Sequence, residues 1–264
     1  MCMRRSESSL LWRVGFIVVL LGFSTATLVA QGSTMTYGPY DGDTVTFLSV
    51  TEASGTDEGA LPLFDEPAVV GNSLVFDPTS SFAADTVGPL ADSTDGKLDI
   101  VIDADEGMVI QSIDLEESGT VSLSADDENG AAMAGAAVSA TVFLRVLEVD
   151  DFVQENPPLL ITELTFSPSG GNWISIQDGF LTNEPWSGFL SIDVVGFLSD
   201  EGISGSATKV LVTLDNGLAA WSQTGTAAHI DKEEFIIRTP EPATLALLAI
   251  AAGCALLMIV RGKR

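Results

Sequence analysis

The sequence predicts an all-β protein whose central part folds as an antiparallel β-sandwich of jelly-roll type. Three observations favour this fold class. Apolar residues recur at every second position, turn-forming clusters separate these stretches, and residues 31–238 contain no amphipathic helical repeat of useful length. Antiparallel strands at this spacing pack as two sheets. A jelly roll suits the size of this part better than a seven-stranded immunoglobulin-like fold.

Alternation is clearest in residues 98–103, 136–149 and 210–214, each of which can place its apolar side chains on one face. The last segment runs into Asp215-Asn216-Gly217, a strong signal for a two-residue hairpin turn. Residues 131–140 would also suit a short helix and are assigned to a strand. Further strands are expected at residues 45–50, 73–76, 109–115, 120–124, 159–166, 189–197 and 228–238.

Clusters of turn-forming residues separate the expected strands. They combine Gly with Asp, Glu, Asn or Ser, which tolerate or stabilise the backbone geometry of tight turns. The clusters are Asp57-Glu58-Gly59, Asp95-Gly96, Glu128-Asn129-Gly130, Ser169-Gly170-Gly171 and Asp200-Glu201-Gly202. The sequence therefore predicts a turn at each of these positions.

Residues 1–30 have the features of a secretory signal peptide. Arg4, Arg5 and Arg13 are basic, residues 14–23 are an apolar run of ten, and small residues follow. Cleavage is expected after Ala30 or, alternatively, after Gly32. An apolar run of this length is too short to span a bilayer, which takes about 20 helical residues. We therefore expect export rather than an N-terminal anchor.

The C-terminal segment, residues 239–264, has the features of a membrane anchor. Residues 243–260 carry no charge and, as a helix, would reach about 27 Å, close to the roughly 30 Å hydrocarbon core of a bilayer. Arg261, Lys263 and Arg264 follow and are expected to act as a basic stop on the cytoplasmic side. Proline restricts its own backbone and that of the preceding residue, so the segment before the helix should be stiff and extended.

This tail resembles the PEP-CTERM sorting domain of bacteria. The likeness rests on Pro240, Glu241 and Pro242, on the apolar run, and on the basic end, in that order. It covers only the tail, and it implies an exported protein recognised by an exosortase, a membrane protease or transpeptidase, in a bacterium that makes exopolysaccharide. The alternative is a plain single-pass anchor with a proline-rich neck.

Charge and cysteine content exclude several classes of function. Residues 31–239 carry thirty-five acidic and five basic side chains, a net charge of −30. Such a surface repels nucleic acid and attracts cations and basic partners, so we exclude nucleic-acid binding. Cys2 and Cys254 lie in the signal peptide and the apolar tail, so the mature domain has no disulfide and no cysteine nucleophile.

Two acidic clusters are candidate calcium ligands because each places several carboxylate oxygens in one expected loop. Neither has the spacing of a helix–loop–helix calcium site. The favoured interpretation is a solvated acidic surface and a protein without a cofactor, and calcium binding is the alternative. The residues are Asp103, Asp105 and Glu106 in the first cluster and Asp126, Asp127 and Glu128 in the second.

Aromatic side chains are the candidates for glycan contact, because sugars present apolar C–H faces that stack on rings. Trp186 lies in the turn-like residues 183–188 and is expected to be the most exposed, with Trp173 as a second candidate. Trp221 follows the expected hairpin at alternating spacing and is assigned to the core. Tyr37 and Tyr40 are further available rings. For each tryptophan, packing in the core is the default interpretation, and glycan contact is the alternative.

The sequence favours a protein that is not an enzyme. His229 is the single histidine and lies in an expected strand, which leaves no common zinc site, and no serine occupies a nucleophile elbow. Carboxylate pairs for glycoside hydrolysis are available, but nothing in the sequence selects one pair.

Three functions follow from these features. The first is an exported surface or extracellular-matrix protein with a structural or adhesive β-domain. It would be held by its C-terminal helix or processed by the exosortase, after passage through the secretion machinery. The second is a carbohydrate-binding module for exopolysaccharide. The third is a glycan-acting hydrolase.

Overall fold

The computed structural model describes residues 34–56, 61–78, 82–126 and 132–240 of the 264-residue chain. The expected signal peptide, the motif residues Glu241 and Pro242, the apolar run and the basic end lie outside the described residues. Within these ranges, no helix combines the length and apolar character needed to cross a bilayer.

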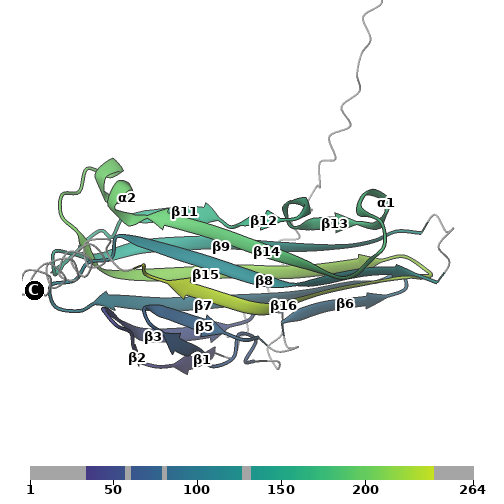
Figure 1. Ribbon diagram of the computed structural model, residues 1–264, viewed down its shortest axis with the longest axis horizontal. Coiled ribbons are helices and arrows are strands. Elements are labelled where there is room, and N and C mark those ends of the chain that lie inside the picture. The colour runs from purple at the N-terminus through teal and green to yellow at the C-terminus, as the bar shows by residue number, and fades with distance from the viewer. Residues whose placement is uncertain (1–33, 57–60, 79–81, 127–131, 241–264) are drawn as a thin grey trace, which may run out of the picture. The chain divides into compact units, whose positions relative to one another are not determined.

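The described strands form two antiparallel sheets, as the sequence predicts (Figure 1). Sheet A contains β1 (Thr34–Tyr37), β2 (Tyr40–Asp41), β3 (Val45–Ala53), β7 (Ala91–Ala104), β9 (Ala134–Val149), β10 (Phe152–Val153), β11 (Leu159–Glu163), β13 (Asn172–Ile174) and β15 (Ala207–Ser222). Its order is β1-β3-β7-β15-β9-β10, with β2 beside β3 and both β11 and β13 beside β9.

Sheet B contains β4 (Ala68–Val70), β5 (Ser73–Phe76), β6 (Ala83–Val87), β8 (Ser112–Ala125), β12 (Thr165–Ser167), β14 (Leu181–Asp193) and β16 (Thr226–Arg238). Its order is β12-β14-β8-β16-β5-β4, with β6 beside β16. Alternate residues of the long strands in both sheets are buried, so each sheet turns one face to a shared core. The predicted β-sandwich is therefore confirmed.

Three short helical segments interrupt the strands: η1 (Ser169–Gly171), α1 (Ser175–Asp178) and α2 (Val194–Asp200). The first contains the Ser169-Gly170-Gly171 cluster, and the Asp200-Glu201-Gly202 cluster ends the third, so both are sites where a strand does not continue. Residues 194–197, however, were expected in a strand and are helical. The side chain of Asp193 accepts a hydrogen bond from the Gly196 N–H, which caps the start of α2.

Most expected strands lie inside observed ones, including residues 45–50, 73–76, 136–149 and 228–238. Two expectations differ in detail. Residues 109–115 and 120–124 mostly belong to the single strand β8, and residues 159–166 are divided between β11 and β12, which lie in different sheets. The chain thus passes from sheet A to sheet B at Leu164 and returns to sheet A at β13.

Two predicted turns are wrong: Asp95-Gly96 and Asp215-Asn216-Gly217 lie within β7 and β15. They face each other across the sheet, with Asn216 opposite Gly96. Gly96 is buried, and a Cβ there would lie 2.9 Å from the ring of Phe64 and 3.0 Å from that of Phe82. Here the glycine gives room to core rings rather than a reversal of the chain.

The core is built on packed phenylalanine rings. Phe64 makes edge contacts with Phe82 at 5.0 Å, with Phe235 at 5.9 Å and with Phe76 at 6.1 Å between ring centroids. All four side chains are fully buried. Burying such a side chain contributes about 1.5–3 kcal/mol, so this cluster supplies stability that disulfides provide in many exported domains.

Glu52 on β3 is a buried carboxylate that holds the segment before β4. Its Oε1 accepts the N–H groups of Leu63 and Phe64, and its Oε2 accepts the hydroxyl of Tyr37 at 3.2 Å. Burial raises the pKa of Glu52 above its usual value, although these hydrogen bonds oppose the shift. The fold therefore makes this side chain easier to protonate than an exposed glutamate.

The raised pKa predicts a pH-dependent effect of Glu52→Gln. An acid whose pKa is raised on folding contributes stability below its unfolded pKa, about 4.5, and loses that contribution as the pH rises through the folded pKa. Glutamine keeps the acceptor for the two N–H groups and carries no charge. We expect the melting temperature of the variant, relative to the parent, to be higher at about pH 7.5 than at about pH 4.5. Equal differences at both pH values would contradict the assignment.

Candidate functional site

The outer face of sheet A is hollowed where two neighbouring rows of residues have short side chains. One row crosses four strands and consists of Ser93, Ala219, Ala137 and Asn172, which are partners in the strand register. Apart from the exposed Asp92, their neighbours along the strands are buried and face the core, so these side chains face outward. The adjacent row contains Asp95, Gly217 and Ser139.

Three adjoining hollows of about 500, 360 and 240 Å³ follow these rows. The first and second share Ser93 and Ala219. The second and third share Val138, Ser139 and Asn172. Together they make one trough, the sheet A groove, which crosses β7, β15 and β9 and ends beside β11 and β13.

Trp221 lies at one end of the groove, at the end of β15. It is half-buried, and its neighbour Ala220 faces the core, so Trp221 faces outward. Its indole ring lies over Gly135 of β9, where a Cβ would come within 2.5 Å of ring atoms. The glycine lets the ring lie close to the sheet. The assignment of Trp221 to the core was therefore wrong.

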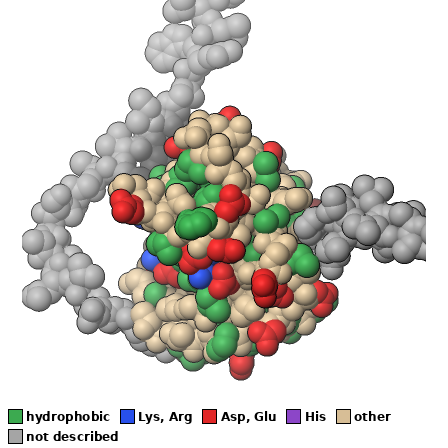
Figure 2. Space-filling model, turned by 90° about the vertical axis from the view of Figure 1, so that its left-hand side faces the viewer, with side chains coloured by type: hydrophobic (Ala, Val, Ile, Leu, Met, Phe, Trp, Pro, Cys, Tyr) green, Lys and Arg blue, Asp and Glu red, His purple; other side chains and the backbone are tan. Residues whose placement is uncertain are grey.

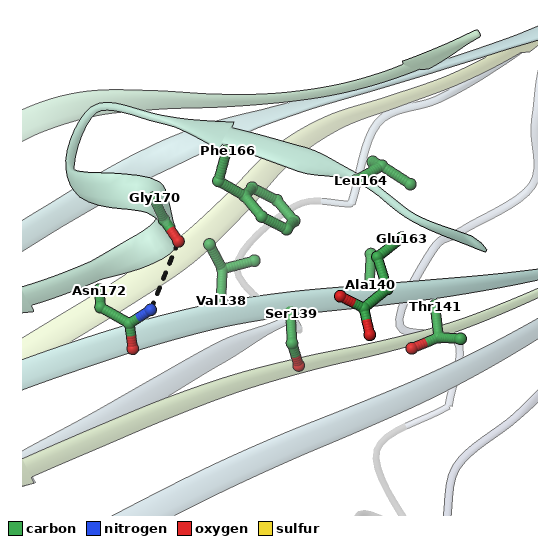
Figure 3. Close-up of a pocket in the computed structure, with 9 residues that line it drawn as sticks. All are labelled: Val138, Ser139, Ala140, Thr141, Glu163, Leu164, Phe166, Gly170 and Asn172. Carbon is green, nitrogen blue, oxygen red and sulfur yellow. Dashed lines mark hydrogen bonds between the residues drawn. The ribbon is translucent and has the colours of Figure 1, made fainter. Parts of the chain in front are cut away.

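The other end of the groove lies where the chain leaves sheet A at Leu164 and returns at β13 (Figure 3). Between β11 and β13, strand β9 has no continuous partner on this side. Ser139, Thr141 and Glu163 bring hydroxyl and carboxylate groups to the wall, and the Phe166 ring adds an apolar surface. Asn172 Nδ2 donates to the Gly170 carbonyl at 3.3 Å, which fixes its carboxamide.

Two carboxylates at the Trp221 side of the groove serve as hydrogen-bond acceptors. Asp95 accepts the N–H groups of Thr56 at 2.6 Å and Gly55 at 3.2 Å. Burial would raise the pKa of Asp95, but hydrogen bonds from Thr56, Gly55 and Ser54 outweigh it and lower this pKa below its usual value. Asp92 accepts the Asp85 N–H at 2.9 Å. An ionised, bonded carboxylate such as Asp95 suits binding better than proton donation.

Neither of the predicted glycan contacts lies on the surface. Trp173 is 1% and Trp186 is 2% exposed, so the expectation that Trp186 is the most exposed tryptophan is wrong. Trp186 is paired with Gly119 of β8 in sheet B, where a Cβ would lie 2.7 Å from its ring, and its Nε1 donates to the Thr120 carbonyl at 3.3 Å. A sequence that looked turn-like thus belongs to β14.

The candidate calcium ligands are dispersed where they are described. Asp103 pairs with Lys209 at 3.3 Å, and Asp127 and Glu128 lie outside the described residues. Asp105, Glu106 and Asp126 belong to no group of three or more acidic, histidine or cysteine side chains that could hold a metal; none occurs in the described ranges. Figure 2 shows acidic side chains spread over the face it presents, with few basic ones among them.

His229 lies on β16 of sheet B. Its side-chain contacts are with two aspartates and do not resemble those of a zinc site or a catalytic triad. Its Nδ1 is 2.6 Å from Asp85 Oδ1, and its Nε2 is 3.5 Å from Asp231 Oδ2. The contact with Asp85 connects β16 with β6, and the contact with Asp231 lies within β16, which supports the interpretation of His229 as a structural strand residue. That the protein has no enzymatic activity stays a prediction.

Comparisons with known proteins give only distant likenesses. No family model and no curated protein matches the chain. Among solved structures, TmCBM61 in complex with β-1,4-galactotriose is 10% identical over 79% of this chain and 90% of that one, with a TM-score of 0.21. The family 11 xylanase from Neocallimastix patriciarum is 10% identical over 79% and 100%, with a TM-score of 0.21.

A family 12 xyloglucanase from Bacillus licheniformis is 11% identical over 79% of this chain and 100% of that one, with a TM-score of 0.19. At these TM-scores, none of the three likenesses carries an argument about function. The case for a function therefore rests on the groove.

Proposed function

We propose that this chain is an exported bacterial surface protein whose sandwich, of jelly-roll type, binds an extended polysaccharide in the sheet A groove without cleaving it. The observation that carries the proposal is the groove itself. It joins an outward-facing indole ring at Trp221 to hydroxyl, carboxamide and carboxylate groups at Ser139, Asn172 and Glu163.

The shape of the groove suits a chain of sugar rings. Its floor includes several Ala, Ser and Gly residues, so a ring can approach the strands closely. From β7 through β15 and β9 to β13, it crosses three strand spacings of about 4.8 Å each, room for an oligosaccharide of about three rings. An indole face binds the C–H face of a sugar, and polar groups at the far end bind its hydroxyls.

The negative charge of the groove and of the whole domain limits which polysaccharides could bind. Asp92, Asp95 and Glu163 line the groove, and residues 31–239 carry a net charge of −30. A polysaccharide rich in carboxylate or sulfate groups would be repelled. We therefore infer a neutral or basic glycan, either the cell's own exopolysaccharide or an external one.

A structural or adhesive domain is the second candidate. Phe152 and Val153 of β10 are 75% and 74% exposed beside β9 of sheet A, and exposed apolar side chains at a sheet edge favour contact with another protein. Under this alternative the groove would bind no sugar. A glycan hydrolase, the third candidate, would shorten the polysaccharide that it binds.

Replacing Trp221 tests glycan binding. We expect the full chain to retain neutral oligosaccharides on a glycan array, and Trp221→Ala to weaken binding to the best of them about tenfold or more because the stacking ring is lost. Phe189→Ala is the matched control, since Phe189 is 49% exposed and lies in β14 of sheet B. Absence of any retained glycan, or equal affinity of the Trp221 variant, would reject the proposal. New reducing ends would indicate a hydrolase.

Calcium is tested by melting. We expect equal melting temperatures in calcium and in chelator, because the described carboxylates are dispersed and a cation would gain few ligands at once. Magnesium at the same concentration controls for screening of the negative surface. A rise in melting temperature with calcium alone, abolished by Asp126→Asn, would instead support a site at residues 126–128.

We also propose that residues 239–264 sort the protein to the cell surface. The support is the ordered tail itself: Pro240-Glu241-Pro242, an uncharged run at residues 243–260, and a basic end. The exosortase would recognise the motif while the helix holds the chain in the membrane. The domain then lies outside the cytoplasm, either anchored or released after processing.

Alanines at positions 240–242 should separate export from processing. We expect the triple variant to lose its signal peptide normally but to stay unprocessed at the C-terminus and held in the membrane fraction, because only the recognised motif has changed. The test is to fractionate the cells and to detect by mass spectrometry whether each fraction contains the uncleaved C-terminal peptide. Normal trimming and release of this variant would leave only a plain membrane anchor.

A further inference from the structure

A cluster of three polar side chains lies inside the core, on the opposite face of sheet A from the groove. Glu117 comes from β8, Asn216 from β15 and Lys232 from β16, and they are 2%, 1% and 1% exposed. Lys232 Nζ and Asn216 Nδ2 both contact the same oxygen, Glu117 Oε2, the latter at 2.6 Å. An amine and a carboxamide from opposite sheets therefore meet at one carboxylate.

The surroundings of Lys232 are aromatic. Its Nζ lies 4.8 Å from the centroid of the Phe82 ring, 5.3 Å from that of Phe64 and 5.8 Å from that of Phe235. Burial lowers the pKa of the Lys232 ammonium, although the charge and hydrogen bond of Glu117 oppose the shift. Burial thus favours the neutral form of this amine more than water does for an exposed lysine, and the neutral amine is a nucleophile.

The hydrogen bonds of the cluster are incomplete. Glu117 Oε1 and Asn216 Oδ1 are buried and have no hydrogen-bond partner. Unpaired buried oxygens are costly, and apolar side chains usually serve a core better than a buried ion pair. A proton on Glu117 would add a hydrogen-bond donor to a cluster in which the Asn216 carbonyl has none.

The backbone beside the cluster is irregular at Lys232 and lined by small residues. The strand register shifts between Lys232 and Glu234, a bulge of the kind that redirects side chains beside reactive sites. The strand partner of Lys232 is Gly119, and those of Asn216 are Gly96 and Ala140, so small residues lie beside both groups. The positions of Lys232 and Asn216 therefore depend on several strands at once.

We propose that the chain joins Lys232 to Asn216 by an intramolecular isopeptide bond, with Glu117 as the catalytic proton carrier. The neutral Nζ attacks Cγ of Asn216, a Nζ–Cγ bond forms, and the Cγ–Nδ2 bond breaks. The Lys232 ammonium gives up two protons, one of which leaves on Nδ2 as ammonia, while the other stays on Glu117. One amide replaces another, so no oxidant and no activated co-reactant is needed.

The bond would connect β15 of sheet A to β16 of sheet B by a covalent link through the core. Residues 31–239 contain no cysteine, so no disulfide can make such a link. The modification needs no ligand, which makes it independent of glycan binding and of its tests.

Peptide mapping of the purified full chain tests the bond. Trypsin should fail to cut after Lys232 and should release residues 210–238 as one peptide, lighter by about 17 Da than its sequence because one ammonia is lost. Further cleavage after Trp221 with chymotrypsin should leave the two parts, one with Asn216 and one with Lys232, still joined. Ordinary cleavage after Lys232 and an unshifted mass would overturn the proposal and leave a structural ion pair only.

Variants separate the roles of the residues. Glu117→Gln keeps the size of the side chain and cannot take up the proton, so a folded variant should show the unshifted mass. Lys232→Met should do the same, and Lys97→Met, which replaces an exposed lysine of β7, should keep the loss of about 17 Da. Circular dichroism shows which variants fold. The chain without substitutions still tests the bond by its mass if Lys232→Met does not fold. Loss of ammonia in folded Glu117→Gln would exclude Glu117 as the proton carrier.

Discussion

The structure depends on the burial of one ammonium group between the two sheets. A charge taken from water is tolerated only with a partner of opposite charge and close contacts, and Lys232 has both in Glu117 and three phenylalanine rings. These groups come from β8, β16 and the segments before β4 and β6, while Asn216 adds a contact from β15. A shift of any of these strands by one residue would leave a buried charge unpaired, so the cluster fixes their register.

The fold class could be predicted because alternation along a strand directly reports which face is buried. Residues 98–103 and 210–214 showed it and lie in β7 and β15. The turn signals at Asp95-Gly96 and Asp215-Asn216-Gly217 failed because they depend on neighbours along the chain. The backbone conformation at these positions is determined by residues distant in the sequence. Gly96 is paired with Asn216 across the sheet, and the rings of Phe64 and Phe82 fill the space beside it in the core.

That one error also hid the groove. If a hairpin is placed at residues 215–217, Trp221 belongs to a new strand, and the alternation of the preceding strand no longer tells which face of the sheet its side chain is on. Within one continuous strand, Val212 and Leu214 face the core, so Trp221 faces outward with Gly217 and Ala219. The parity of residue numbers could therefore have identified Trp221. No signal in the sequence could have shown that Gly135 lies beneath its ring, or that Gly119 lets Trp186 turn inward, because these contacts join distant strands.

The groove and the buried cluster share the same strand segments. Gly217 and Asp95 form part of the groove, while their neighbours Asn216 and Gly96 face the core. The contacts of Asn216 thus fix β15 directly beneath the groove, which would hold the floor in place before the proposed ligand binds and would reduce the entropy lost on binding. If an extended polymer pulls on sheet A, the force reaches sheet B through β15 and β16. A covalent link between Asn216 and Lys232 would carry this force between the two sheets, whereas a single ion pair could break under it.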